Sequence, residues 1–200
     1  MWPLHPKKAD NIAGSLISVA KALEQVASVG VHVRPGISHD DLLHSIGGSI
    51  ESTVDWVRLL CVLGSEVERG NFDRVSDDIW HFDAECIEAD GDYVAIANRF
   101  VILAKGALPL ADIRDRVKVE DGEAWLEFAL EGQRIHWDLK AKNDWADPEL
   151  YLRLQQLVAA RTAGKRFFTA GLGQDSLISF GDDQMRQALS KLSGLEFQWE

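Results

Sequence analysis

The chain has 200 residues, of which 46% are hydrophobic, so it is long enough to bury the core of one good-sized domain. Its net charge of -11 repels phosphate backbones and anionic lipid, which argues against nucleic acids and membrane surfaces as partners. No run approaches the roughly 20 apolar residues of a membrane helix, and the start MWPLHPKK lacks the apolar segment of a secretory signal. Its two cysteines are too few for a disulfide scaffold, so we expect reduced thiols and a cytoplasmic protein.

The first 50 residues (1–50) predict an N-terminal helical segment that precedes an α+β domain over residues 51–200. Asp10 is expected to cap a helix running to about Ala27, because apolar residues recur there at spacings of three and four. Ser38 with Asp41 three residues later resembles a capping box, which predicts a second, short helix. Whether this segment packs on the rest of the chain is left open.

From residue 56 onward the pattern of apolar residues changes. VRLLCVLG (57–64) is interpreted as a buried strand, although a helix is possible at this length. DDIWHFDAECI (77–87) alternates as a half-buried strand does. Asp90 or Asp92 is expected to cap the next helix, and LPLADIRD (108–115) predicts another helical turn or two.

The segment AWLEFALEGQRIHWDL (124–139) predicts a β-hairpin around a two-residue Glu131-Gly132 turn. That turn sets a register in which the apolar residues of both strands share one face: Leu126, Phe128, Ile135 and Trp137. The opposite face then carries Trp125, Glu127, Ala129, Arg134, His136 and Asp138.

The last third of the chain predicts two helices and three short strands. Asp147 followed by proline is a helix N-terminus, and Asp182 is expected to cap the last helix. RFFTA (166–170) and SLISF (176–180) predict strands, as does LEFQWE (195–200). The sum is an α+β fold, a mainly antiparallel sheet with helices packed on one face.

The acids are concentrated in SDDIWHFDAECIEADGDY (76–93), which holds seven Asp or Glu and no Lys or Arg. They form the candidate steering surface for a basic partner: Asp77, Asp78, Asp83, Glu85, Glu88, Asp90 and Asp92. A tryptophan beside carboxylates suits the same partner, because its ring stacks on arginine and supplies buried area. The candidate anchors are therefore Trp125, Asp144, Trp145 and Asp147. The alternative is that these charges only keep the surface soluble and that the tryptophans belong to the core.

Two clusters of histidine and carboxylate residues suggest a metal site as an alternative. His81, Asp83 and Glu85 share one face of a predicted strand, and His136 and Asp138 share a face of another, so they could converge on a divalent ion. Alternate side chains of one strand lie about 7 Å apart, which is too far for three of them to bind one ion unaided. A cross-strand pair between Glu127 and His136 would also account for that histidine. No cofactor is expected.

Nucleophilic catalysis has little support in the sequence. Cys61 and Cys86 each fall on an apolar face, where cysteine is usually a small core residue. A Gly-x-Ser-x-Gly nucleophile elbow is absent. GLGQD (171–175) lacks the lysine and the glycine spacing of a phosphate-binding loop, so we interpret it as a turn.

The strings WHFDAECIE…GDY, AWLEF…HWDL…NDWADPEL and GLGQDSLISF resemble small bacterial proteins that we associate with the immunity proteins of toxin–immunity pairs. The resemblance covers roughly residues 56–200. It implies a small acidic cytosolic protein that binds one toxin domain and blocks it. No residue's role is carried over, since immunity proteins belong to many unrelated families.

These observations together predict a non-enzymatic acidic binding protein, an immunity protein that neutralises a cationic, nuclease-like toxin domain. Its partner would be a basic protein, and its oligomeric state is left open. A metal-dependent hydrolase using the two histidine clusters is one alternative. A structural or adaptor subunit that oligomerises through the N-terminal helices is the other.

Overall fold

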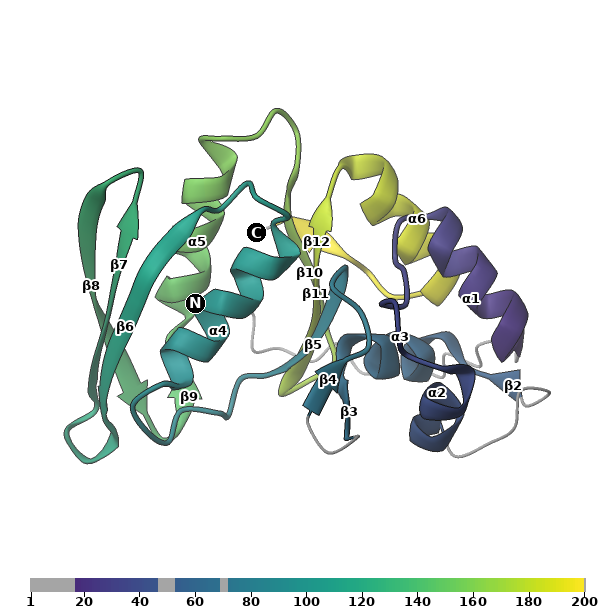
Figure 1. Ribbon diagram of the computed structural model, residues 1–200, viewed down its shortest axis with the longest axis horizontal. Coiled ribbons are helices and arrows are strands. Elements are labelled where there is room, and N and C mark those ends of the chain that lie inside the picture. The colour runs from purple at the N-terminus through teal and green to yellow at the C-terminus, as the bar shows by residue number, and fades with distance from the viewer. Residues whose placement is uncertain (1–16, 47–52, 69–71, 200) are drawn as a thin grey trace. The chain divides into compact units, whose positions relative to one another are not determined.

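The computed structural model describes residues 17–46, 53–68 and 72–199 (Figure 1). By their contacts these residues form two compact units. Unit 1 comprises Asp83–Arg166, and unit 2 comprises the described residues up to Phe82 together with Phe167–Trp199. The boundary expected at residue 50 and the expected cap at Asp10 both lie outside the described residues, so they remain predictions.

Unit 2 is a mixed unit of helices and short strands. Its main sheet has the strand order β12-β10-β11-β5, and β1-β2 and β3-β4 form two small antiparallel pairs. The helices are α1 (Val19–Ser28), α2 (His39–Ile46), α3 (Trp56–Gly64) and α6 (Asp183–Ser193). The strands are β1 (Ile17–Ser18), β2 (Thr53–Val54), β3 (Glu66–Glu68), β4 (Phe72–Arg74), β5 (Ile79–Asp83), β10 (Arg166–Gly171), β11 (Asp175–Gly181) and β12 (Gln198–Trp199).

The core of unit 2 joins the beginning of the chain to its end. Val26 of α1 and Leu42 of α2 are buried in one cluster with Leu59 of α3, Phe168 of β10 and Phe197. The described part of the first 50 residues therefore packs against later segments. The predicted capping box of α2 is confirmed, because Ser38 N donates to Asp41 Oδ2 (2.7 Å) and Asp41 N donates to Ser38 Oγ (3.2 Å).

The prediction of a buried strand over residues 57–64 is wrong, because this segment is helix α3. Asp55 is its N-cap and accepts a hydrogen bond from Arg58 N (2.9 Å). The buried residues Leu59, Leu60 and Leu63 recur at helical spacing. The dense apolar run of a buried helix is indistinguishable from that of a buried strand, and the capping aspartate was the signal that separates them.

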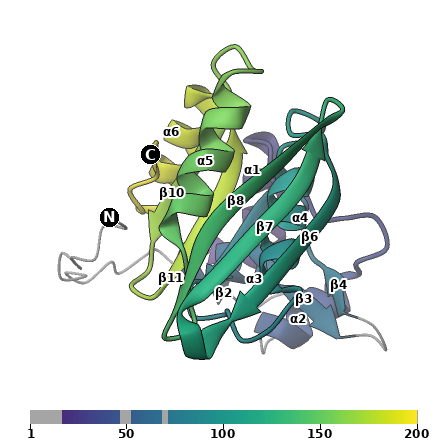
Figure 2. The same cartoon turned by 90° about the vertical axis from the view of Figure 1, so that its left-hand side faces the viewer.

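Unit 1 is a four-stranded antiparallel sheet with two helices. The strand order is β6-β7-β8-β9, and Figures 1 and 2 show α4 and α5 on one side of it. Its elements are α4 (Asp92–Leu103), β6 (Leu110–Lys118), the short 3-10 helix η1 (Val119–Asp121), β7 (Glu123–Leu130), β8 (Gln133–Lys142), β9 (Trp145–Ala146) and α5 (Pro148–Ala159). The side chains of Leu126 and Phe128 are fully buried, so the inner face of β7 lies in the core.

The predicted hairpin register is confirmed residue by residue. Phe128 pairs with Ile135, and Leu126 pairs with Trp137. The turn residues Glu131 (φ 53°) and Gly132 (φ 82°) both have positive φ, as a two-residue turn between twisted strands requires.

Three boundaries differ from the sequence-based expectations. Ile17–Ser18 is strand β1 and not the first turns of a helix, and LPLADIRD leads into strand β6 and not into a helical turn. The N-cap of α4 is Gly91, not Asp90 or Asp92. The predicted caps of α5 and α6 are confirmed: Asp147 accepts from Glu149 N (3.0 Å), and Asp182 accepts from Met185 N (2.9 Å).

The α+β assignment is confirmed by these helices and antiparallel strand pairs. Among the helices of the described residues, none combines the length and the apolar content that crossing a bilayer requires.

Candidate functional site

The two acids at the start of the acidic stretch have partners within unit 2. Asp78 is only 7% exposed and accepts hydrogen bonds from His32 N (2.7 Å) and from the His32 ring (Nδ1, 3.0 Å). Asp77 lies between Arg34 Nε (3.1 Å) and Arg74 Nε (2.9 Å). Asp78 is thus buried, whereas the Asp77 side chain is 38% exposed, and both carboxylates hold neighbouring segments together. Their place in a steering surface stays a prediction.

Asp90, in the loop before α4, and Asp92, the first residue of α4, are also hydrogen-bonded internally. Asp92 Oδ2 accepts from Glu88 N and Ala89 N, each at 2.7 Å. Asp90 Oδ1 accepts from Val117 N (2.7 Å), and its other oxygen pairs with Arg116 Nη1 (3.1 Å). Asp92 therefore supplies an acceptor for two N–H groups of the loop, and Asp90 supplies one for an N–H group of strand β6.

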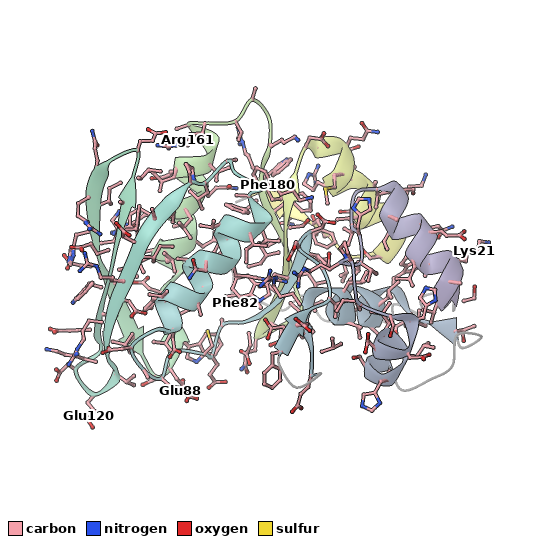
Figure 3. The ribbon with its side chains drawn as sticks, in the orientation of Figure 1. Lys21, Phe82, Glu88, Glu120, Arg161 and Phe180 are labelled. Carbon is pink, nitrogen blue, oxygen red and sulfur yellow. The ribbon has the colours of Figure 1, made fainter. Side chains whose placement is uncertain are left out.

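The three remaining acids of the predicted steering surface are exposed side chains of unit 1: Asp83, Glu85 and Glu88. Figure 3 shows the Glu88 side chain projecting outward from the loop that leads into α4. Asp83 Oδ1 also accepts from Glu85 N (2.9 Å), so it orders its own turn. These three stay candidates for contact with a partner.

The predicted anchors divide into two that pack on a sheet face and two that order the chain. Trp125 is half-buried on the outer face of β7, and its ring centroid lies 5.3 Å from that of His136. Trp145 is half-buried in β9, where it pairs with Lys142 and, through an isolated bridge, with Glu85. Both tryptophans remain candidates for partner contact.

Asp144 and Asp147 have mainly structural contacts. The carbonyl of Asp144 accepts from Ile87 N (2.8 Å). The carboxylate of Asp147 caps α5 and accepts from Lys140 N (2.8 Å), while its own N–H donates to the hydroxyl of Tyr93 (2.8 Å). Both carboxylate oxygens of Asp147 bind backbone N–H groups, which gives this residue a structural role, and its role as a partner-binding anchor stays a prediction.

The histidines proposed for a metal site have carboxylate neighbours of their own. His81 Nε2 lies 3.2 Å from Asp175 Oδ2, and His136 lies between Glu127 (3.8 Å) and Asp138 (3.4 Å). Over residues 17–46, 53–68 and 72–199, no group of three or more His, Cys, Asp or Glu side chains is placed to hold a metal ion. Among these residues the geometry therefore offers no support for the alternative of a metal centre at the two histidine clusters.

The His81–Asp175 pair invites comparison with a cysteine nucleophile site, because Cys61 lies near Asp175. Burial, together with the charges of Asp175 and Asp55, raises the pKa of Cys61 to about 11. Burial likewise raises the pKa of Cys86 to about 12, with added repulsion from Asp83. A nucleophilic cysteine needs a lowered pKa, so neither thiol is activated in this environment.

An exposed aromatic side chain that the sequence reasoning missed lies on the β3–β4 hairpin of unit 2. Phe72 is 70% exposed. Its cross-strand partner is Glu68, and Glu66 lies two residues before Glu68 on the same face of β3. Val67, on the opposite face, is buried. We refer to the exposed face formed by Glu66, Glu68 and Phe72 as the acidic ribbon.

A signal for the acidic ribbon was present in the sequence. EVE and FDR are separated by three residues, which puts Phe72 opposite Glu68 and therefore on the polar face. Both glutamates are exposed, and neither forms an ion pair within the part of the chain that the structure describes. The nearby Arg74 is directed to Asp77 instead. Arg74 is nevertheless the cross-strand partner of Glu66 on this face. An exposed aromatic ring beside carboxylates is the arrangement that the sequence reasoning had sought around Trp125.

Comparison with protein-family models, with curated proteins and with solved structures finds no match to this chain. The candidate site consequently stands on the geometry of its own residues.

Proposed function

We propose that this chain is a non-enzymatic binding protein that neutralises a cationic protein, as an immunity protein neutralises a toxin domain. The observation that carries the proposal is the 70% exposure of Phe72 on the acidic ribbon. The contact surface would be the acidic ribbon, with the exposed acids of residues 83–88 as further sources of negative charge.

The acidic ribbon has the two properties that a cationic partner requires. Burying a phenylalanine side chain in an interface contributes about 1.5–3 kcal/mol, and a cation over its ring adds roughly 0.5–2 kcal/mol. Glu68 stands opposite Phe72, and Glu66 lies on the same face opposite Arg74, so both carboxylates can pair with a lysine or arginine that approaches the ring. A large aromatic ring left in water by a folded chain is a candidate hot spot for this reason.

The charge of the chain supports the same partner. The net charge is -11, and in unit 2 the carboxylates outnumber Lys and Arg by about two to one. Such a field accelerates association with a cationic protein by about 10- to 1000-fold at low salt. The raised pKa values of Cys61 and Cys86 favour a binding role over a cysteine-dependent enzyme.

The test is to measure the affinity for the basic protein encoded by the neighbouring gene, across a salt series from about 50 mM to about 300 mM. The proposal expects the affinity to fall steeply with salt. The double variant Glu66→Lys/Glu68→Lys should weaken binding at least about tenfold. Glu24→Lys/Glu196→Lys makes the same change in net charge on exposed side chains of the same unit and should weaken binding far less.

A second pair of variants isolates the aromatic contact. Phe72→Ser should weaken binding about tenfold or more through faster dissociation. Leu152→Ser, which changes an apolar residue of α5 that is 37% exposed, is the matched control and should have little effect. Salt-independent affinity, no binding, or equal effects of Phe72→Ser and Leu152→Ser would each refute the proposal.

A further inference from the structure

The outer face of the unit 1 sheet has the opposite polarity to the acidic ribbon. Figure 2 shows β6, β7 and β8 side by side, and the residues that alternate away from the buried face are largely Lys and Arg on β6 and β8. The pairing register places Arg114 beside Glu127 and His136, and Arg116 beside Trp125 and Asp138. We call this surface, with Arg134 and Lys140, the basic face.

One carboxylate of the basic face is shared by three basic groups. Glu127 lies 3.5 Å from Arg114, 3.6 Å from Arg134 and 3.8 Å from His136. It is only 26% exposed, whereas Arg114 is 61% exposed and Arg134 is 43% exposed. Arg134 also lies 4.0 Å from Asp112 Oδ2 and donates to the Asp112 carbonyl (3.3 Å). Among the described residues Arg114 pairs with Glu127 alone, so its guanidinium group keeps donors directed to solvent.

Further cations extend the basic face along β8. Lys140 and Lys142 are exposed and project to the same side as His136, because they lie two residues apart along one strand. Neither lysine side chain forms an ion pair with any residue described by the structure. The half-buried ring of Trp125 lies on the same face and supplies apolar area next to these charges.

We propose that the basic face docks an acidic polypeptide segment of a partner protein. The segment's carboxylates would pair with Arg114, Arg134 and Lys140, and an apolar side chain between them would cover Trp125. Charge complementarity carries this inference: among the described residues Arg114 shares its one carboxylate, Glu127, with Arg134, and Lys140 and Lys142 form no ion pair, so the carboxylates of a docked segment would supply partners for these cations.

A polypeptide fits this face better than a nucleic acid does. Glu127 and Asp138 stand among the cations and would repel a continuous phosphate backbone, and Asp138 is 97% exposed. An acidic peptide can place its carboxylates beside the arginines and neutral or basic side chains beside Asp138. The inference does not depend on the acidic ribbon, since it concerns another surface and a partner of opposite charge.

The experiment titrates the full chain into a fluorescently labelled peptide of Glu, Leu and Gly, about 12 residues long, which when extended crosses three strands. The same peptide with Lys in place of Glu and a single-stranded oligothymidine of equal length are the comparison probes. We expect the acidic peptide to bind with an affinity that falls with salt. The other two probes should bind at least about tenfold more weakly.

Variants then place the binding on the basic face. Arg114→Glu/Arg134→Glu should weaken acidic-peptide binding at least about tenfold and should gain affinity for the lysine peptide. Lys140→Glu/Lys142→Glu breaks no ion pair among the described residues, so it tests the same face without disturbing the fold. Lys105→Glu/Lys165→Glu, which changes two exposed lysines of unit 1 outside the sheet, is the matched control and should leave binding within about twofold.

Absence of acidic-peptide binding to the unaltered chain overturns the inference. So does equal weakening by the Lys105/Lys165 control, or tighter binding of the oligothymidine than of the acidic peptide. None of these outcomes touches the acidic ribbon, whose own test uses a basic partner.

Discussion

Two acidic segments of this chain use their carboxylates in different ways. Around the start of α4, Asp90 and Asp92 accept hydrogen bonds from backbone N–H groups. On the acidic ribbon, Glu66 and Glu68 face solvent beside an exposed ring. The carboxylates of Asp90 and Asp92 accept from backbone N–H groups, whereas Glu66 and Glu68 accept no hydrogen bond among the described residues and remain in the solvent. The number of acids in a segment is therefore a poor measure of the charge that a partner meets.

The largest effect on the free energy of unfolding is expected for a carboxylate that accepts hydrogen bonds from the backbone, in contrast to a carboxylate of the acidic ribbon. Asp115 of β6 accepts from Gly91 N (2.7 Å) and Val94 N (3.1 Å), so Asp115→Ala leaves two N–H groups at the start of α4 without acceptors. We expect this change to lower the free energy of unfolding by about 2–4 kcal/mol in urea denaturation. Glu68→Ala on the acidic ribbon should change it by less than about 0.5 kcal/mol. Similar values for the two variants would contradict the distinction.

A smaller loss of stability is expected at the N-cap of α5. Asp147→Ala removes the acceptor for Glu149 N and for Lys140 N and should cost about 1–2 kcal/mol. Asp147→Asn keeps one acceptor oxygen and should recover part of the loss. Thermal unfolding followed by circular dichroism would measure both. If Asp147→Ala instead leaves stability intact and weakens partner binding, Asp147 is an anchor after all.

The two cysteine thiols predict how the free energy of unfolding depends on pH. Their pKa values in the folded chain, about 11 for Cys61 and about 12 for Cys86, lie above the ordinary value of 9.0. A raised pKa means that the folded state favours the protonated thiol, so this contribution to stability is complete below pH 9 and is lost as the pH rises through 11–12. Cys61→Ser/Cys86→Ser should flatten the decline of unfolding free energy above pH 9.

Alkylation provides an independent measurement of the same thiols. Because the thiolate is the reactive species, the raised pKa values should slow the reaction with iodoacetamide at pH 8, relative to the chain in urea, by roughly 100-fold at Cys61 and roughly 1000-fold at Cys86. Mass spectrometry after timed quenching gives the two rates. Reaction at Cys61 in the folded chain as fast as in urea would reopen a catalytic role for the His81–Asp175 pair.

The smallest effect on stability is expected for the two glutamates of the acidic ribbon, whose replacement should nevertheless change partner binding. Glu66→Gln/Glu68→Gln removes two exposed charges that form no ion pair among the described residues, so unfolding free energy should shift by less than about 0.5 kcal/mol. The salt dependence of partner binding should nevertheless become shallower. A clear loss of stability would show that these glutamates hold the fold.

Local rules predicted part of the fold well. The β7–β8 register followed from the Glu131-Gly132 turn, because the side-chain alternation of both strands agreed on one inner face. The helix N-caps Asp147 and Asp182 were likewise predicted from neighbouring residues alone. The helix α3 was missed because a short apolar run has no periodicity that distinguishes a helix from a strand. β6 was missed because its outer face is charged, which a helical turn on the surface would also show.

The candidate site was less predictable than the fold. The exposure of Phe72 depends on which face of a three-residue strand packs on unit 2, and that is a tertiary property. The burial of Asp78 depends on His32, which lies 46 residues away in the sequence. Composition indicated an acidic protein, but the acids that remain exposed were decided by such distant partners.

The central claim, that the acidic ribbon is the contact surface for a cationic protein, is tested most directly by hydrogen–deuterium exchange of the chain alone and in complex with the basic product of the neighbouring gene. We predict slower exchange on binding in the peptides that contain β3 and β4, around Glu66–Glu68 and Phe72–Arg74. Unchanged exchange in these strands, together with protection elsewhere in the complex, would contradict it.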